Sequence, residues 1–166
     1  SLVYQTLHYM DFIKNLGVDE AVLVIEDWIK NNKPFKLNFT NENWSRYVIS
    51  KRVANWIFMI SRNRNQIDSE RLKKIEYSIF VQLRFLFNNL EFDIKGNHLI
   101  KNLKALILGS LYFESIESER WLYKSIKILA NEIDKQILND GFHYELSPSY
   151  HLIVLEDLLE ILIFLK

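Results

Sequence analysis

Two short segments carry most of the side chains that could do acid–base chemistry. The segment ILNDGFHYELSPSYHL, residues 137–152, holds two His, two Tyr, an Asp, a Glu and a Ser-Pro pair in one connection between predicted helices. The segment GNHL, residues 96–99, places an Asn and a His directly after a glycine. Imidazole, phenol and carboxyl groups are the usual proton carriers of enzymes, so both segments are candidate sites.

Composition limits the partners that the chain can attract. Its 166 residues carry 21 Lys+Arg and 21 Asp+Glu, so there is no global field to attract nucleic acid or an anionic membrane. Acidic residues interrupt the C-terminal apolar stretch HLIVLEDLLEILIFLK, so no run reaches the roughly 18 residues of a membrane span. We therefore expect no nucleic acid partner and no membrane segment, and any polyanion must be met locally.

Apolar periodicity predicts an all-α chain. Hydrophobic residues make up 49% of the sequence, and four Gly and two Pro leave little room for β-turns. Apolar residues recur at three- and four-residue spacing, which indicates amphipathic helices. About seven helices are expected. They cover residues 3–15, from 19 to before Lys33-Pro34, from a cap at Thr40 or Asn41 through Ile60, from 68 or 69 to 89, from about 97, from 118 to before Asp140, and from Ser147-Pro148 onward.

Short connections between long helices favour antiparallel neighbours. The expected fold is therefore a set of antiparallel helical hairpins in a single all-α domain, residues 1–166. The last helix is apolar and has no polar stop, so we expect a C-terminal remainder of the chain or an oligomer partner to cover it. The chain has no Cys, which excludes a disulfide framework and leaves the compartment open.

Both chemical segments resemble, in order and spacing, the N-terminal helical domain of the heparinase II/III-like polysaccharide lyases. The segment WSRYVISKRVANWI, residues 44–57, is also similar to the family's upstream helix, so the resemblance covers roughly residue 44 to the C-terminus. The residues that carry the resemblance are Leu90-Glu91, Gly96-Asn97-His98-Leu99, Asn102, Ala105-Leu106, Asp140-Gly141, His143, Glu145, Ser147-Pro148 and Tyr150-His151.

The resemblance implies part of an (α/α) toroid, which the family follows with a β-sandwich domain that this chain does not contain. It implies a bacterial periplasmic or secreted lyase that cleaves a uronic-acid-containing polysaccharide by β-elimination, with that acidic polysaccharide as its partner. Family members draw further catalytic groups from the rest of the toroid and from the β-sandwich. We therefore expect this chain to hold half an active site and to show little or no turnover alone.

The resemblance also assigns roles to residues. Asn97 would neutralise the uronate carboxylate, His98 would be a second donor or a base, and Tyr150 would act as acid or base. Such groups are needed because the C5 proton of a uronate becomes acidic only when the adjacent carboxylate is neutralised. A tyrosine, with an ordinary pKa of about 10, needs neighbouring positive charge or donors to act as a base. The implied substrate-binding residues are Arg52, His143, Glu145 and His151.

Each assignment has a structural alternative. Asn97 is also a natural helix cap, His98 could be a partly buried histidine, and Tyr150 could be a packing residue. Asp140 fits turn chemistry, and Glu145 fits a brace for a histidine or a helix end.

Two other function classes fit the same residues. An (α/α) toroid glycoside hydrolase would need two carboxylates that face each other across a cleft, either Asp140 and Glu145 or Glu91 and Asp93. A carbohydrate-binding or assembly module would need no catalytic pair. The histidines do not have the spacing of a sequence-defined metal motif, so we predict no metal and no cofactor.

Overall fold

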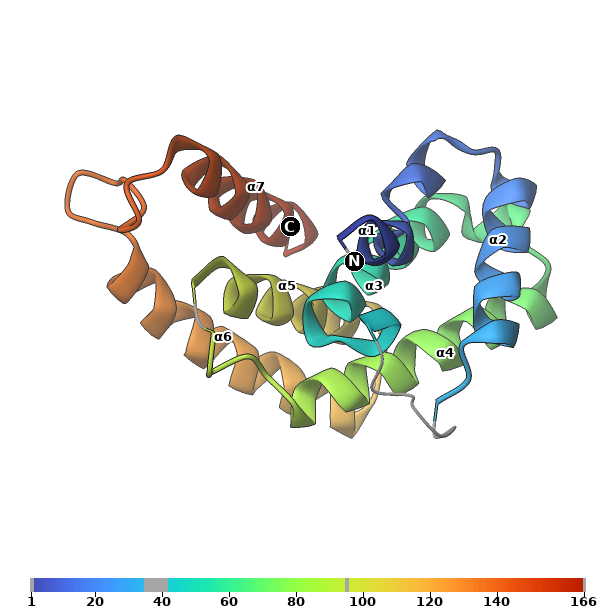
Figure 1. Cartoon of the computed structure of the whole chain (residues 1–166). Coiled ribbons are helices and arrows are strands. Elements are labelled where there is room, and N and C mark those ends of the chain that lie inside the picture. The colour runs from blue at the N-terminus through green and yellow to red at the C-terminus, as the bar shows by residue number, and fades with distance from the viewer. Residues whose placement is uncertain (1, 35–41, 95, 166) are drawn as a thin grey trace. The chain divides into compact units, whose positions relative to one another are not determined.

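The computed structural model describes residues 2–34, 42–94 and 96–165. These residues form helices (Figure 1), turns and one isolated β-bridge, which joins Ile137 and His143. This confirms the all-α class. The α-helices are α1 (Leu2–Tyr9), α2 (Val18–Asn31), α3 (Arg46–Asn63), α4 (Ser69–Asn88), α5 (Gly96–Tyr112), α6 (Ile116–Gln136) and α7 (Pro148–Phe164), and short 3-10 helices lie at Asp11–Asn15, Glu42–Trp44 and Arg64–Gln66.

The chain divides into two compact units, Ser1–Asn88 and Asn89–Lys166, and each is described by itself. The predicted site residues fall in the second unit, with the exception of Arg52, which belongs to the first. The single domain expected from the sequence stays a prediction.

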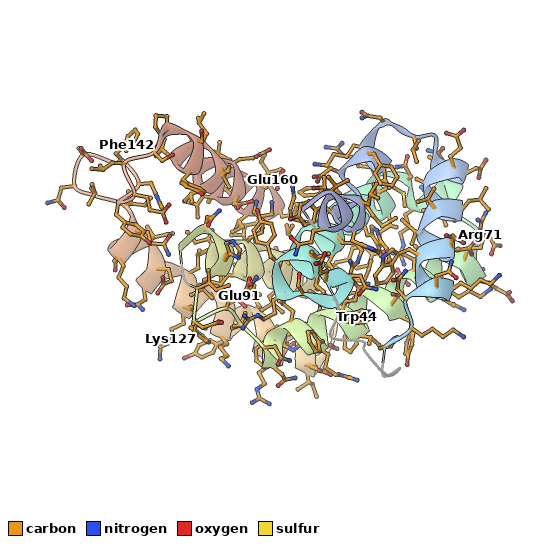
Figure 2. All side chains as sticks on the ribbon, viewed as in Figure 1. Trp44, Arg71, Glu91, Lys127, Phe142 and Glu160 are labelled. Carbon is orange, nitrogen blue, oxygen red and sulfur yellow. The ribbon has the colours of Figure 1, made fainter. Side chains whose placement is uncertain are left out.

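The first unit has a core of aromatic rings. Helices α3 and α4 pack together through a short 3-10 connection, while α1 lies on α3 and α2 lies on α4. The ring centroids of Trp28 and Trp56 lie 5.5 Å apart at an interplanar angle of 80°, an edge-to-face arrangement. Trp44 joins them, with its ring centroid 6.1 Å from that of Trp28 (Figure 2).

Helix α5 is the centre of the second unit, and both α6 and α7 pack against it. Every residue of α5 from Leu99 to Ser110 is buried, including Lys101, Asn102 and Lys104. Leu99, Ile100, Leu103 and Ile107 are accordingly no more than 1% exposed. The residues at the start of α5 are therefore carried by a firmly packed element.

Two lysines of α5 are matched by acids of α7. Nζ of Lys101 lies 2.8 Å from Asp157, and Nζ of Lys104 lies 2.7 Å from the same carboxylate. Lys104 also contacts Glu160, which Figure 2 labels on α7. Burial alone would lower the pKa of Lys104, but the charge of Asp157 and the hydrogen bonds to both acids outweigh it and raise that pKa. The cluster therefore places opposite charges together inside the α5–α7 interface.

The first helix is shorter than the sequence predicts. The pattern indicated residues 3–15, but α1 ends at Tyr9 and Met10 adopts φ 58. The sulfur of Met10 accepts the indole N–H of Trp56 at 3.1 Å. A contact with another helix therefore accompanies this break, and no sequence signal marks it.

Both ends of α6 also differ from the boundaries that the sequence predicts. It begins at Ile116, because the hydroxyl of Ser115 accepts the N–H of Ser118 at 3.0 Å and caps the helix. The sequence placed the start at Ser118 itself. The helix ends at Gln136, before the expected stop at Asp140.

The remaining boundaries agree more closely. Helices α2, α4 and α7 begin within one residue of the expected positions. Helix α3 begins at Arg46. The caps expected for α3, Thr40 and Asn41, lie outside the described residues.

Candidate active site

Helix α5 begins at Gly96, where the backbone enters the helix from a left-handed conformation. Gly96 has φ 56, which glycine adopts without steric cost. Asn97 follows inside the first turn and is half-buried, so it is not the cap residue that was one alternative for it. Its side-chain amide makes no hydrogen bond with another described residue. The described residues therefore leave both the donors and the acceptor of this amide unengaged.

The inner side of His98 faces a buried carboxylate. Nδ1 of His98 lies 3.5 Å from Oε1 of Glu91, a residue that Figure 2 labels just before α5. Asn102, one turn further along α5, donates its amide to Oε2 of Glu91 at 2.8 Å and accepts the Glu91 backbone N–H at 3.0 Å. Glu91 is 4% exposed, while the His98 side chain is 34% exposed. The imidazole thus combines an anchored inner edge with partial access to solvent.

The connection between α6 and α7, residues 137–147, is a compact loop. The N–H of Leu138 donates to the carbonyl of Phe142 at 2.8 Å. The carboxylate of Asp140 accepts the N–H of Phe142 at 3.0 Å, so Asp140 does have the turn role that the sequence suggested. Gly141 completes the turn with φ 86.

His143 is the buried support of this loop. Its ring is fully buried, with Nε2 3.2 Å from Oε1 of Gln136, and Nδ1 accepts the N–H of Glu145 at 3.4 Å. Burial lowers the pKa of His143, so the ring is neutral near pH 7. The two contacts fit the tautomer with the proton on Nε2. A contact of His143 with substrate stays a prediction.

The end of α6 and the 137–147 loop both contact the start of α5. The amide of Gln136 donates to the carbonyl of Gly96 at 3.4 Å and to Glu132 at 2.9 Å. A β-carbon built on Gly96 would lie 3.1 Å from a carboxylate oxygen of Glu145 and 3.6 Å from the hydroxyl of Tyr144. Burial, followed by the charge of Glu145, raises the pKa of Tyr144. The two candidate segments of the sequence therefore adjoin at Gly96.

The first turn of α7 carries Tyr150 and His151. Tyr150 is 44% exposed, and its hydroxyl has no hydrogen-bond partner among the described residues. The His151 ring stacks on that of Phe142, which Figure 2 labels; the ring centroids lie 4.5 Å apart and the planes meet at 7°. Its Nδ1 is buried with no hydrogen-bond partner in the described part of the chain. Tyr150 thus presents an accessible phenol, and His151 is fixed against the loop.

Arg52 has a different setting, inside the first unit. Its side chain is fully buried, donates to Gln82 at 2.8 Å and to the carbonyl of Asn43 at 3.0 Å, and lies 3.9 Å from the ring of Trp28. Burial lowers its pKa well below the ordinary value. These contacts fit a role in the core of the unit, and its contact with substrate stays a prediction.

Sequence reasoning missed three members of this arrangement. Glu91 was given no role, although its carboxylate lies 3.5 Å from Nδ1 of His98, and Asn102 and Gln136 were given none in the chemistry. A signal did exist for Asn102, since it follows His98 by four residues and therefore shares its helix face. Nothing comparable marked Gln136, whose partners come from other elements.

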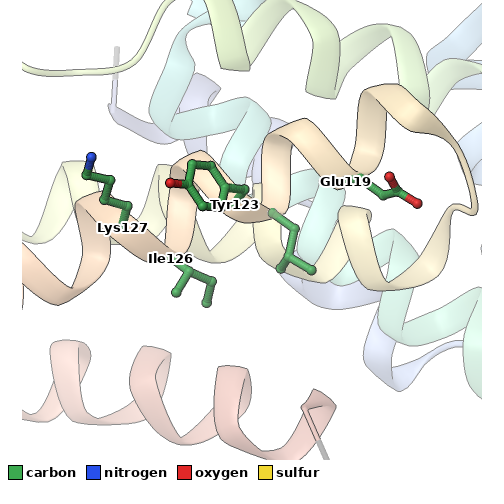
Figure 3. A pocket seen from close by; sticks show the side chains of 5 residues that line it. Glu119, Tyr123, Ile126 and Lys127 are labelled. Atoms are coloured by element: carbon green, nitrogen blue, oxygen red, sulfur yellow. The ribbon is translucent and has the colours of Figure 1, made fainter.

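A separate open hollow of about 410 Å³ lies on α6. Figure 3 shows its lining side chains projecting from that one helix: Glu119, Leu122, Tyr123, Ile126 and Lys127. None of the predicted site residues lines it, and its surface is mainly apolar. We therefore place the candidate chemistry at the start of α5.

Two further properties concern the described residues alone. They contain no group of three or more His, Cys, Asp or Glu side chains placed to hold a metal ion. None of their helices combines the length and the apolar character needed to cross a membrane.

Known proteins of similar sequence are lyases of bacteria. Heparin-sulfate lyase of Bacteroides thetaiotaomicron is 28% identical over 146 residues, which cover 86% of this chain and 21% of that protein. Heparin-sulfate lyase of Pedobacter heparinus is 30% identical over 142 residues, which cover 82% of this chain and 21% of that protein. The chain thus spans about a fifth of the length of the curated relatives it matches.

A solved structure and a family model also match this chain. A solved structure described as the crystal structure of heparinase III superposes with a TM-score of 0.74 at 26% identity, over 89% of this chain and 23% of that one. This agrees with helical hairpins that form part of an (α/α) toroid. The family model described as Heparinase II/III N-terminus matches residues 3–166. The chain therefore belongs to the heparinase II/III N-terminal family.

Proposed function

We propose that the protein containing this chain is a polysaccharide lyase that cleaves a uronic-acid-containing polysaccharide by β-elimination, and that the chain supplies one half of the active site. The family and the two lyase relatives support the class of reaction. The observation that carries the proposal is the meeting at Gly96 of the segment bearing Asn97 and His98 with the loop that precedes Tyr150.

The reaction sets clear demands on the site. A base removes the proton at C5 of the uronate, the C5 electron pair forms a double bond to C4, and the C4–O bond breaks. An acid then protonates the departing oxygen. Since negative charge builds up beside the carboxylate of the uronate, that carboxylate must be neutralised for the proton to leave.

Asn97 meets the need for a neutralising group in this proposal. Its amide has no partner among the described residues and lies in the first turn of α5. Backbone N–H groups and the positive end of the helix dipole also favour an anion at this place. Asn97 therefore binds the uronate carboxylate, with Glu145 and His151 as neighbouring groups that contact the saccharide.

His98 and Tyr150 are the proton carriers. Both side chains are partly exposed, as groups that exchange protons with a substrate must be. One of them takes the C5 proton, and the other serves the leaving oxygen. Arg52 and His143 are buried, so in this proposal Arg52 supports the core of the first unit and His143 supports the 137–147 loop.

The two other function classes have less support. The Asp140 carboxylate is engaged in the loop turn, and Glu91 is buried against Asn102, so neither is placed as an open member of a hydrolase pair. A non-catalytic saccharide-binding module predicts that Tyr150→Phe leaves binding unchanged and that even the complete protein forms no elimination product.

The test is an elimination assay on the complete protein. Uronate polymers such as heparan- and alginate-type chains are offered, and the ultraviolet absorbance of the unsaturated product is followed. Asn97→Ala and Tyr150→Phe should each reduce kcat by about 100-fold or more, as loss of a proton carrier or charge stabiliser does. Tyr123→Phe, which changes an exposed tyrosine on α6, is the matched control. Product formation that is insensitive to both site variants would contradict the assignment.

An elimination assay of this chain by itself tests whether it holds only one half of the active site. It should form little or no unsaturated product, because the further catalytic groups expected of the family lie outside its 166 residues. Measurable turnover by the chain alone would overturn this part of the proposal.

A partner at α7 and a periplasmic or secreted location complete the proposal. Leu152, Leu155, Leu159 and Leu162 on α7 are between 42% and 63% exposed, a large apolar area for a protein surface. Either additional chain, as the longer relatives have, or a second copy would cover it. Large polysaccharides are met outside the cytoplasm, which is the reason for the proposed location.

A further inference from the structure

We infer that Glu91 is a positioning residue that fixes the tautomer of His98, with the proton on Nδ1 and the lone pair on Nε2. The tautomer is argued from the contacts that join Glu91 to Asn102 and to His98. Its consequence for catalysis rests on the proposed function, which left His98 as either a donor or a base.

The orientation of Glu91 is set by Asn102 at both ends. The backbone N–H of Glu91 donates to Oδ1 of Asn102 at 3.0 Å, and Nδ2 of Asn102 donates to Oε2 of Glu91 at 2.8 Å. Because an N–H needs an acceptor, the Asn102 oxygen must face the backbone, and its NH₂ group must face the carboxylate. Glu91 is 4% exposed, so this pairing is shielded from solvent. One carboxylate oxygen, Oε1, is thereby directed toward His98.

The carboxylate then dictates the protonation of the ring. An ionised carboxylate accepts hydrogen bonds and cannot donate them, so Nδ1 of His98, 3.5 Å away, is favoured as the protonated nitrogen. The separation is long for a hydrogen bond, but the negative charge also repels a lone pair at Nδ1 across this distance. A neutral His98 therefore carries its proton-accepting lone pair on Nε2.

This tautomer decides between the two roles of His98 in the proposed reaction. The C5–H bond of the uronate breaks, and the proton passes to Nε2 of His98. The C5 electron pair forms the double bond to C4 as the C4–O bond breaks, and the Tyr150 hydroxyl gives its proton to the departing oxygen. The imidazolium that forms on His98 is stabilised by the charge of Glu91.

Glu91→Gln gives a sharp test because Asn102 controls its outcome. The Asn102 NH₂ group still needs an acceptor, so the side-chain oxygen of the introduced glutamine takes the place of Oε2. The NH₂ group of that glutamine then faces Nδ1 of His98, which must become an acceptor. The tautomer should reverse, with the proton moving to Nε2.

The measurement is ¹⁵N NMR of the histidine rings of this chain, at a pH where neutral imidazole dominates. The His98 signals are identified by their loss in His98→Gln. The wild-type chain should show a protonated Nδ1, and Glu91→Gln should show a protonated Nε2. Glu156→Gln, which changes an exposed glutamate on α7, should leave the His98 signals unchanged. A wild-type ring protonated on Nε2, or a tautomer unaltered in a folded Glu91→Gln chain, would overturn the inference.

Activity separates this inference from the proposed function. In the complete protein, Glu91→Gln should lower kcat by about 10- to 100-fold with a smaller change in KM, the range found for partners that orient metal-bound imidazoles. If the complete protein eliminates no uronate polymer, the proposed function fails, while the wild-type tautomer still decides the role of Glu91. An active protein whose kcat is unaltered by Glu91→Gln would contradict the catalytic consequence.

Discussion

The carboxylate of Glu145 lies against the backbone of Gly96, so that a β-carbon at Gly96 would stand 3.1 Å from Oε1. Few real β-carbons have a neighbour this close, and Gly96 also has φ 56. The backbone conformation therefore favours glycine here, and the approach of the Glu145 carboxylate leaves little room for a β-carbon.

Gly96→Ala should lower the free energy of unfolding of the second unit by about 1–3 kcal/mol. Alanine would have to adopt the left-handed conformation, and its β-carbon would lie close to the carboxylate of Glu145. Denaturant unfolding followed by circular dichroism measures the change. Gly141→Ala is the matched control, since Gly141 has φ 86 but nothing within 4 Å of its β-carbon position. In the double variant Gly96→Ala/Glu145→Ala, the part of the stability loss that comes from the contact with Glu145 should be recovered. Equal losses in Gly96→Ala and Gly141→Ala, with no recovery in the double variant, would show that the contact is unimportant.

Asp157→Ala should be among the most damaging single changes in the second unit. It leaves Lys101 and Lys104 without the fully buried carboxylate that both contact, and loss of one member of a buried ionic cluster costs about 3–5 kcal/mol. Urea unfolding of the variant gives the difference. Glu156→Ala, one residue away and exposed, should change stability by about 0.5 kcal/mol or less. Similar values for both variants would refute the role of the cluster.

The free energy of unfolding should fall as the pH decreases from 8 toward 5. Burial lowers the pKa of His143 and of His8, so below their ordinary value of about 6.5 the unfolded chain binds protons that the folded chain does not. Their stabilisation is thus complete above that pH and is lost as the pH falls through the lowered values. His8 also accepts the Trp28 indole N–H on Nδ1, a bond that protonation removes. His143→Gln and His8→Gln should each flatten the pH dependence, and an unchanged slope in both would contradict this account.

Gln136→Ala should loosen the 137–147 loop more than it unfolds α6. The substitution removes the acceptor of the buried His143 ring and the donor to the Gly96 carbonyl, and an unsatisfied buried group costs about 1–3 kcal/mol. Amide hydrogen exchange should therefore quicken in the loop. Asn131→Ala, at an exposed position of α6, provides the comparison. Unaltered exchange at Tyr144 and Glu145 in Gln136→Ala would show that the loop is held by other contacts.

Local sequence signals predicted the helices well, and long-range contacts explain the failures. Proline at the start of α7 acts within a few residues and was read correctly. Gly141, which was expected to end α6, instead lies in the loop beyond Gln136, although it does adopt a left-handed conformation. The break at Met10 depends on Trp56, which lies on another helix. A pattern of apolar residues within one segment carries no information about such a partner.

In the candidate site, too, the sequence selected some residues and missed one that the fold brings in from outside the helix. The resemblance selected Asn97, His98 and Tyr150, but the carboxylate that orients His98 precedes α5 and was given no role. Glu91 is not helical, so no periodic spacing connects it with His98 and Asn102. Only the turn into α5 brings it to the ring, and this turn becomes visible in three dimensions.

The ionic cluster on α7 has a consequence for Tyr150. Helix α7 is apolar on most of its circumference, so packing of aliphatic side chains alone would accept several rotations of the helix about its own axis. Only one rotation brings the single carboxylate of Asp157 to both Lys101 and Lys104. Tyr150 precedes Asp157 by seven residues, about two turns, and therefore lies on the same stripe of the helix. A salt bridge remote from the chemistry thus sets the rotation of α7 and, with it, the direction in which the phenol points.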